Sequence, residues 1–81
     1  MTSDPNRVSA EFGGQAHAGQ LVALEGQGGL MRVQVDAAQL EIGQSGVLQM
    51  HDGARFGVVV VEPLGEHAAG HEYRLKLTGR A

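Results

Sequence analysis

Glycine divides this chain into short segments in which apolar and polar side chains tend to alternate. Thirteen of its 81 residues are glycine. An isolated helix needs roughly 12 to 15 residues to be stable in water, whereas a strand needs only about four to eight. The frequent glycines together with the alternating pattern therefore predict an all-β protein.

Six segments have the composition of strands. Val8, Ala10 and Phe12 share one face of the first segment, and Val33 and Val35 share one face of the third. The segment at 20–25 is also compatible with helix, but the glycines on both sides of it favour a strand. We expect strands at residues 7–12, 20–25 with a start as early as residue 16, 30–35, 46–50, 55–62 and 73–78.

The connections carry signals of their own. Asp52 and Gly53 lie between two apolar runs and predict a hairpin turn with a positive φ angle. Pro63 is expected to end the fifth strand, and residues 64–70 are expected to form a loop. Residues 36–41 are good helix formers behind a potential aspartate cap, so we expect at most one short helical turn there.

These elements predict a small six-stranded antiparallel β-barrel, because closure buries the apolar faces of the strands and leaves few open edges. Residues 1–6 are expected to form a flexible tail and residues 7–81 a single domain, since the chain is too short for two. The expected core contains Phe12, Val33, Val35, Val58, Val60 and Leu75.

Charge and composition argue against several functions. Six Lys and Arg residues stand singly along the chain against nine Asp and Glu residues, so we do not expect binding to duplex nucleic acid. No apolar run approaches the roughly 20 residues of a membrane-spanning helix, and membrane insertion is not expected. The absence of cysteine favours the reducing cytoplasm.

No arrangement of side chains in the sequence predicts catalysis, and we assign no catalytic residue. His67 and His71 have the spacing of a helical zinc site, to which Glu66 or His51 could contribute. Gly65 and Gly70 flank residues 66–69 and favour a solvated loop, so no metal site is expected. The glycines at 26, 28 and 29 either direct backbone N–H groups toward an anion or simply form a hairpin turn.

The order of these features resembles that of a PilZ domain. Such domains are six-stranded barrels that commonly bind cyclic di-GMP through an Arg-x-x-x-Arg segment and a later Asp/Asn-x-Ser-x-x-Gly motif. The resemblance therefore implies a bacterial signalling module. It extends over Arg7, Gln20-Leu-Val-Ala-Leu-Glu-Gly-Gln-Gly-Gly-Leu30, Leu40-Glu-Ile-Gly43, Val47-Leu-Gln-Met50 and Tyr73-Arg-Leu-Lys-Leu77.

Both ligand motifs are degenerate in this chain. Arg7 matches the first arginine, but Glu11 stands where the second is expected. In the second motif the corresponding positions are Ala23, Glu25 and Gly28, so only the glycine is retained. Glutamate repels an anionic ligand that arginine would hold. Arg7 and Gly28 are therefore the candidate ligand contacts, and the resemblance implies weak or absent binding of cyclic di-GMP.

We therefore expect a PilZ-like regulatory or adaptor domain that binds a protein partner in cyclic di-GMP-type signalling. The alternative is an unrelated small β-barrel that acts as a structural or assembly module of a larger complex, and the sequence leaves both open. Neither requires a cofactor. Both are compatible with a homodimer, because a second subunit often completes a small core.

Overall fold

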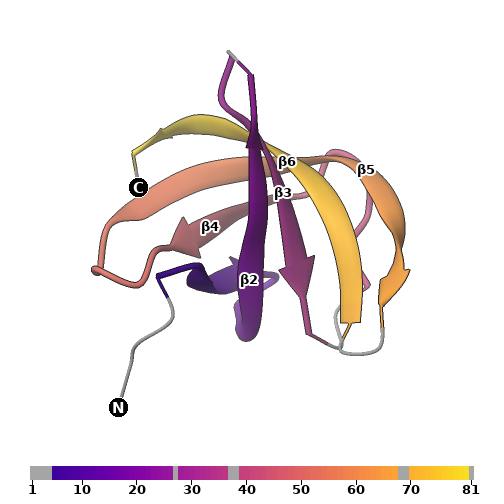
Figure 1. Cartoon of the computed structure of the whole chain (residues 1–81), viewed down its shortest axis with the longest axis horizontal. Coiled ribbons are helices and arrows are strands. Elements are labelled where there is room, and N and C mark those ends of the chain that lie inside the picture. Colours follow the sequence, from indigo (N-terminus) through magenta and orange to yellow (C-terminus); the bar gives the residue numbers. More distant parts are fainter. Residues whose placement is uncertain (1–4, 27, 37–38, 68–69, 81) are drawn as a thin grey trace.

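The chain folds into a closed antiparallel barrel in which the strand order is β1-β2-β3-β6-β5-β4 (Figure 1). The structure is a computed structural model and describes residues 5–26, 28–36, 39–67 and 70–80, with the side chain of His67 left out. The strands are β1 (Arg7–Phe12), β2 (Gln15–Glu25), β3 (Leu30–Val35), β4 (Ser45–Gln49), β5 (Arg55–His67) and β6 (Gly70–Arg80). The predicted all-β six-stranded barrel is confirmed.

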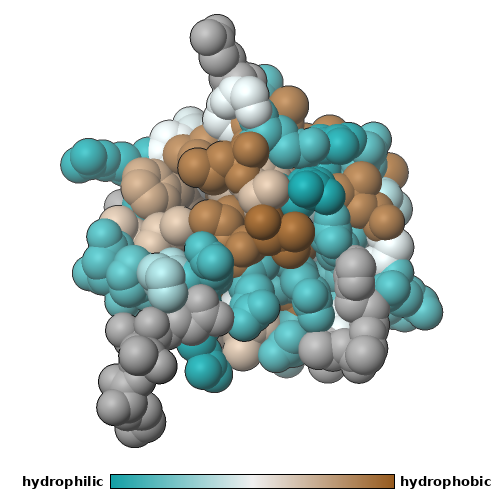
Figure 2. Space-filling model, viewed as in Figure 1, coloured by the Kyte–Doolittle hydropathy of each residue, from teal (hydrophilic) through white to brown (hydrophobic). Residues whose placement is uncertain are grey.

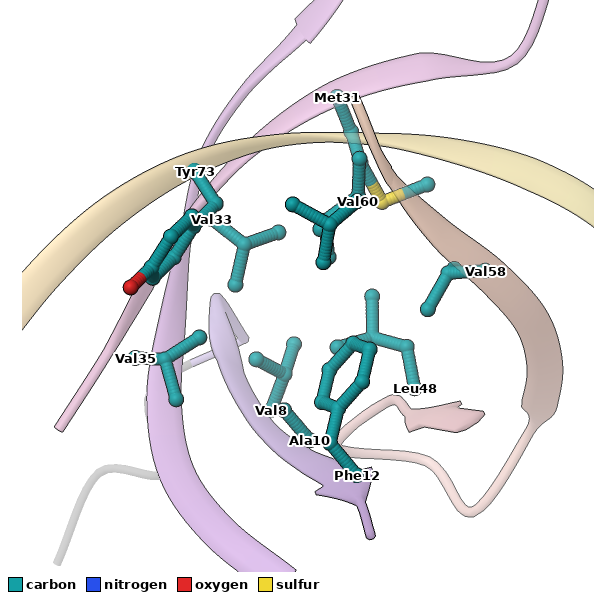
Figure 3. Packing of buried hydrophobic residues seen from close by; sticks show 11 residues of the cluster. Val8, Ala10, Phe12, Met31, Val33, Val35, Leu48, Val58, Val60 and Tyr73 are labelled. Atoms are coloured by element: carbon teal, nitrogen blue, oxygen red, sulfur yellow. The ribbon is translucent and has the colours of Figure 1, made fainter. Parts of the chain in front are cut away.

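The barrel interior is filled by inward-facing side chains of five strands, β1 and β3 to β6, and β2 adds the partly buried Leu21. Figure 3 shows these side chains pointing toward one another from different strands. The six residues expected in the core are all buried, which confirms that the alternating pattern identifies the inward face. The buried apolar side chains are Val8, Ala10, Phe12, Met31, Val33, Val35, Leu48, Val58, Val60, Tyr73 and Leu75.

The connection between β3 and β4 returns across one end of the barrel. It is fixed to β5 by two hydrogen bonds, from the N–H of Gly43 to the carbonyl oxygen of Val60 and from the N–H of Val60 to that of Gln44. The helical turn expected at 36–41 lies partly outside the described residues. The described residues of that segment, Asp36 and 39–41, form no helix.

Strand β5 is longer than the sequence predicts. It continues through Pro63 to His67, and β6 begins at Gly70, so the loop expected at 64–70 is wrong where the structure describes it. Register shifts on both sides of Pro63 accommodate the proline, and β4 pairs with β5 only as far as Val59. Proline is tolerated because no strand needs its missing N–H at this irregular edge.

The boundaries of β2 and β4 differ from the expected boundaries by one residue each. Strand β2 begins one residue before the earliest expected start, and β4 is shifted by one residue toward the N-terminus. The predicted hairpin at Asp52 and Gly53 is confirmed, with φ of 93° at Gly53. Of the expected N-terminal tail only Pro5 and Asn6 are described, and they form a turn.

Gly46 closes the barrel by letting β1 and β4 approach each other. It pairs directly with Phe12, and the aromatic ring covers the space where a side chain would stand. A Cβ atom at this position would lie 2.4 Å from Cδ1 of Phe12 and 2.5 Å from the carbonyl oxygen of Glu11. Glycine is therefore required here for lack of space between the closing strands.

The substitution Gly46→Ala is expected to destabilise the protein by about 1 to 3 kcal/mol, because the ring of Phe12 or the backbone must move. The neighbouring Ser45 is exposed. The control Ser45→Ala is therefore expected to change stability by less than about 0.5 kcal/mol. Urea unfolding of both variants measures this difference, and equal unfolding midpoints would contradict the assigned role of Gly46.

Candidate functional site

Five charged residues form a cluster that connects four neighbouring strands. The members of this charged cluster are Glu25 on β2, Arg32 on β3, Glu62 on β5, and Glu72 and Arg74 on β6. At its centre, Arg74 on β6 donates hydrogen bonds from Nε and Nη2 to the two carboxylate oxygens of Glu25 on β2, at 2.7 and 3.3 Å. Its Nη1 also donates to Glu62 on β5. The guanidinium group of Arg74 thus contacts strands on both sides of the β3–β6 pair.

Arg32 on β3 also lies near the carboxylate of Glu25. It pairs directly with Arg74 in the register of β3 and β6, and two like charges in such a pair repel each other. Its Nε lies 4.0 Å from Glu25, and its Nη1 lies 3.5 Å from the buried carboxylate of Glu72. Glu25 and Glu72 therefore offset the repulsion between the two arginines.

The contacts of Glu25 with Arg74 keep both groups charged. The hydrogen bond from Arg74 holds the pKa of Glu25 below its ordinary value of 4.5, against the opposing effect of desolvation. The same hydrogen bond raises the pKa of Arg74. Neither group exchanges a proton near neutral pH, so the pair is suited to joining strands rather than to acid–base catalysis.

The contribution of Glu25 to stability is expected to depend on pH. Because its pKa is lower in the folded state, Glu25 stabilises the fold above about pH 4.5, and this stabilisation is lost as the pH falls through the lowered pKa. The difference in unfolding free energy between the wild type and Glu25→Gln should be largest at neutral pH. Denaturation between about pH 7 and pH 3 measures it.

The substitution Arg74→Met provides the control for this pH dependence. In that background, the substitution Glu25→Gln should have a smaller effect that changes less with pH, because the main partner of the carboxylate is gone. An effect of Glu25→Gln that is the same at every pH, or unchanged by Arg74→Met, would show that this ion pair does not stabilise the fold.

A cavity of about 460 Å³ opens beside the end of the β5–β6 hairpin. Its walls come from the β3–β4 connection, from β5 and from β6. The lining residues are Gln39, Leu40, Glu41, Pro63, Gly65, Glu66, His71 and Tyr73. This volume lies within the range of small-molecule sites.

Tyr73 joins this cavity to the barrel core. Its side chain is buried, and its hydroxyl oxygen points away from the other core side chains in Figure 3. That oxygen accepts a hydrogen bond of 2.9 Å from the backbone N–H of Leu40. The ring of His71 lies beside that of Tyr73, with 6.3 Å between centroids, and His71 Nδ1 lies 4.0 Å from a carboxylate oxygen of Glu66.

Two exposed apolar residues lie in the C-terminal half of β2. Val22 is 44% exposed and Leu24 is 70% exposed. Figure 2 shows apolar residues gathered on the face of the molecule that carries β2. We call Val22 and Leu24 the β2 patch. A third exposed apolar residue, Ile42, lies in the β3–β4 connection.

Among the described residues, the β2 patch lies on a stretch of β2 that pairs with another strand on one side only, and we call this stretch the open edge. The ladder between β1 and β2 pairs Arg7 with Gln20, and the N–H of Leu21 still donates to the carbonyl oxygen of Asn6. Beyond this point the described strands pair with β2 only through β3, in a register interrupted by a bulge at Val22. The exposed side chains therefore stand next to backbone groups that can accept another strand.

The two predicted ligand contacts lie apart, Arg7 at the start of β1 and Gly28 in the turn between β2 and β3. Exposed Arg7 pairs with Gln20, whereas Gly28 is in the turn beyond Glu25, with φ of 94°. The stretch of β2 from Gln20 to Glu25 alone spans about 16 Å. The structure does not bring Arg7 and Gly28 together, and Glu11 lies 3.9 Å from Arg55 instead.

The residues considered for zinc binding are also distributed over the barrel. Glu66 and His71 face each other across the β5–β6 hairpin, while His51 is in the turn before the opposite end of β5. The side chain of His67 lies outside the described residues. Among the residues that are described, no group of three or more His, Asp or Glu side chains is placed to hold a metal ion.

Comparisons of the chain with protein-family models, with curated proteins and with solved structures find no match. In the described part of the chain, no helix is long and apolar enough to cross a membrane. The features of the molecule that bear on its function are therefore the cavity, the charged cluster and the β2 patch.

Proposed function

We propose that this protein is a non-enzymatic adaptor module of PilZ-like type, which binds a protein partner in cytoplasmic cyclic di-GMP-type signalling and has weak or absent affinity for the dinucleotide. The observation that carries the proposal is the β2 patch, where Val22 and Leu24 are exposed beside an open strand edge. Apolar side chains next to a strand edge that has no partner among the described residues are the combination that a docking strand requires.

Two contributions would hold the partner at this surface. Covering Val22 and Leu24 removes apolar area from water, which favours association. Strand addition along β2 beyond Leu21 supplies backbone hydrogen bonds, while the side chains of alternate residues give specificity. The edge is short, so the partner needs further contacts to reach the roughly 1,200 Å² of a stable interface.

The charges around the degenerate motifs support weak dinucleotide binding. Glu25 occupies the position of the motif serine and is already hydrogen-bonded to Arg74. Its lowered pKa keeps it negatively charged, next to the turn that contains Gly28. Arg7 on β1 pairs with Gln20 of β2, which is too far from this turn for the two to share a phosphate group. A dianionic ligand would therefore lack a cooperating second contact and would meet a fixed carboxylate.

Calorimetric titration with cyclic di-GMP tests the ligand part of the proposal. We expect no measurable heat of binding at physiological salt, and the substitution Arg7→Ala is expected to leave the titration unchanged. A saturable binding isotherm that disappears in Arg7→Ala would contradict the proposal. It would instead identify the protein as a sensor of the dinucleotide.

The double substitution of Val22 and Leu24 by serine tests the docking part. A partner recovered with the wild type should bind it directly after purification, and the double variant should bind at least about fivefold more weakly. Ile42→Ser, which removes an equally exposed apolar side chain outside the β2 patch, is the control. Equal loss in the control, or no loss in the double variant, would contradict docking at the β2 patch.

The open edge also favours a second candidate, an assembly module of a permanent complex. Obligate interfaces are larger and more apolar than those of regulatory partners. A partner that exchanges within minutes supports the adaptor, whereas a complex that does not dissociate on dilution supports the assembly module. Light scattering of the isolated protein tests whether the second subunit is instead another copy of this chain.

A further inference from the structure

The cavity beside the β5–β6 hairpin has a lining that selects for positive charge. Glu41 and Glu66 contribute carboxylates, and Gln39 contributes an amide. Among the described residues, the lining contains no lysine or arginine. The nearest arginine along β6, Arg74, is hydrogen-bonded to Glu25 and Glu62. A cation entering the cavity therefore meets two carboxylates, and an anion meets repulsion.

The same cavity offers apolar and aromatic contacts. Leu40 and Pro63 line it, and the rings of His71 and Tyr73 lie side by side at an interplanar angle of 45°. The buried ring of Tyr73 is fixed at this place by its hydrogen bond with the backbone of Leu40. An aliphatic stem can pack on such a wall, and a planar cation can stack against a ring.

We propose that this cavity binds a guanidinium group carried on an aliphatic stem. The guanidinium group fits better than an ammonium group because its planar fork can share two hydrogen bonds with a carboxylate and can also stack on a ring. Glu66 is the exposed partner for the fork, and Glu41 adds a second carboxylate to the lining. This site is separate from the β2 patch and does not depend on the proposed function.

Two kinds of ligand carry a guanidinium group on an aliphatic stem, a free guanidinium compound and an arginine side chain of another protein. A titration of the full chain followed by NMR distinguishes these sources. The probes are ethylguanidine and N-acetylarginine methylamide, and the neutral control is N-acetylcitrulline methylamide. A compound of this size is expected to bind with a Kd of about 1 mM.

Binding should shift the amide resonances of Leu40, Glu66 and His71, and the neutral citrulline compound should bind at least about fivefold more weakly than the arginine compound. Tighter binding of the arginine compound than of ethylguanidine would assign the site to a protein side chain. Equal binding of the two would assign it to free guanidinium compounds. Either result supports the proposed chemistry.

Matched variants establish where the probe binds. The double substitution Glu41→Gln and Glu66→Gln should weaken binding by about fivefold or more, because it removes both charges from the walls and keeps similar side-chain size. Glu11→Gln, on β1 next to Arg55, should bind as the wild type does. An unchanged amide spectrum elsewhere confirms that each variant is folded.

Three results would overturn the proposal. These are no shift at the cavity with about 10 mM arginine compound, equal affinity for the citrulline compound, and equal weakening by Glu11→Gln. None of them bears on the β2 patch, which is at a different place on the barrel. The failure of this proposal and the failure of the adaptor proposal can thus be told apart.

Discussion

Closure of the sheet through β1 and β4 is the constraint on which the rest of the structure depends. The pairing of Phe12 with Gly46 brings the first strand against the fourth, so the apolar faces of all six strands enclose a single interior. That interior is occupied by large side chains, of which Leu48 and Leu75 have no exposed area. Because the centre is filled, the surfaces available for the proposed contacts are on the outside of the barrel, where the cavity and the β2 patch lie.

The sequence predicts the fold well wherever a feature depends on one strand alone and not on the strands that pair with it. Alternation places Val8, Ala10 and Phe12 on the inward face of the first strand because the strand period alone decides this. The consequence of Pro63 could not be predicted, since a proline interrupts a strand only where its missing N–H faces a partner. Whether one is present depends on how far β4 extends along β5, which is a property of the assembled sheet.

The candidate sites were less predictable because their residues are distant in the chain. Glu25 and Arg74 are 49 positions apart, and Leu40 and Tyr73 are 33 apart, whereas the motifs searched in the sequence span only a few positions. One signal becomes visible once the strand register is known. Arg32 stands directly opposite Arg74, and two facing arginines require carboxylates near them.

The position of Glu25 has a consequence for how this protein tolerates substitution. The carboxylate is hydrogen-bonded to Arg74 and lies near Arg32. Replacing it would remove a contact between three strands and leave each guanidinium group with one carboxylate neighbour, Glu62 for Arg74 and Glu72 for Arg32. One substitution would thus alter both the cohesion of the barrel wall and the charge that this part of its exterior presents.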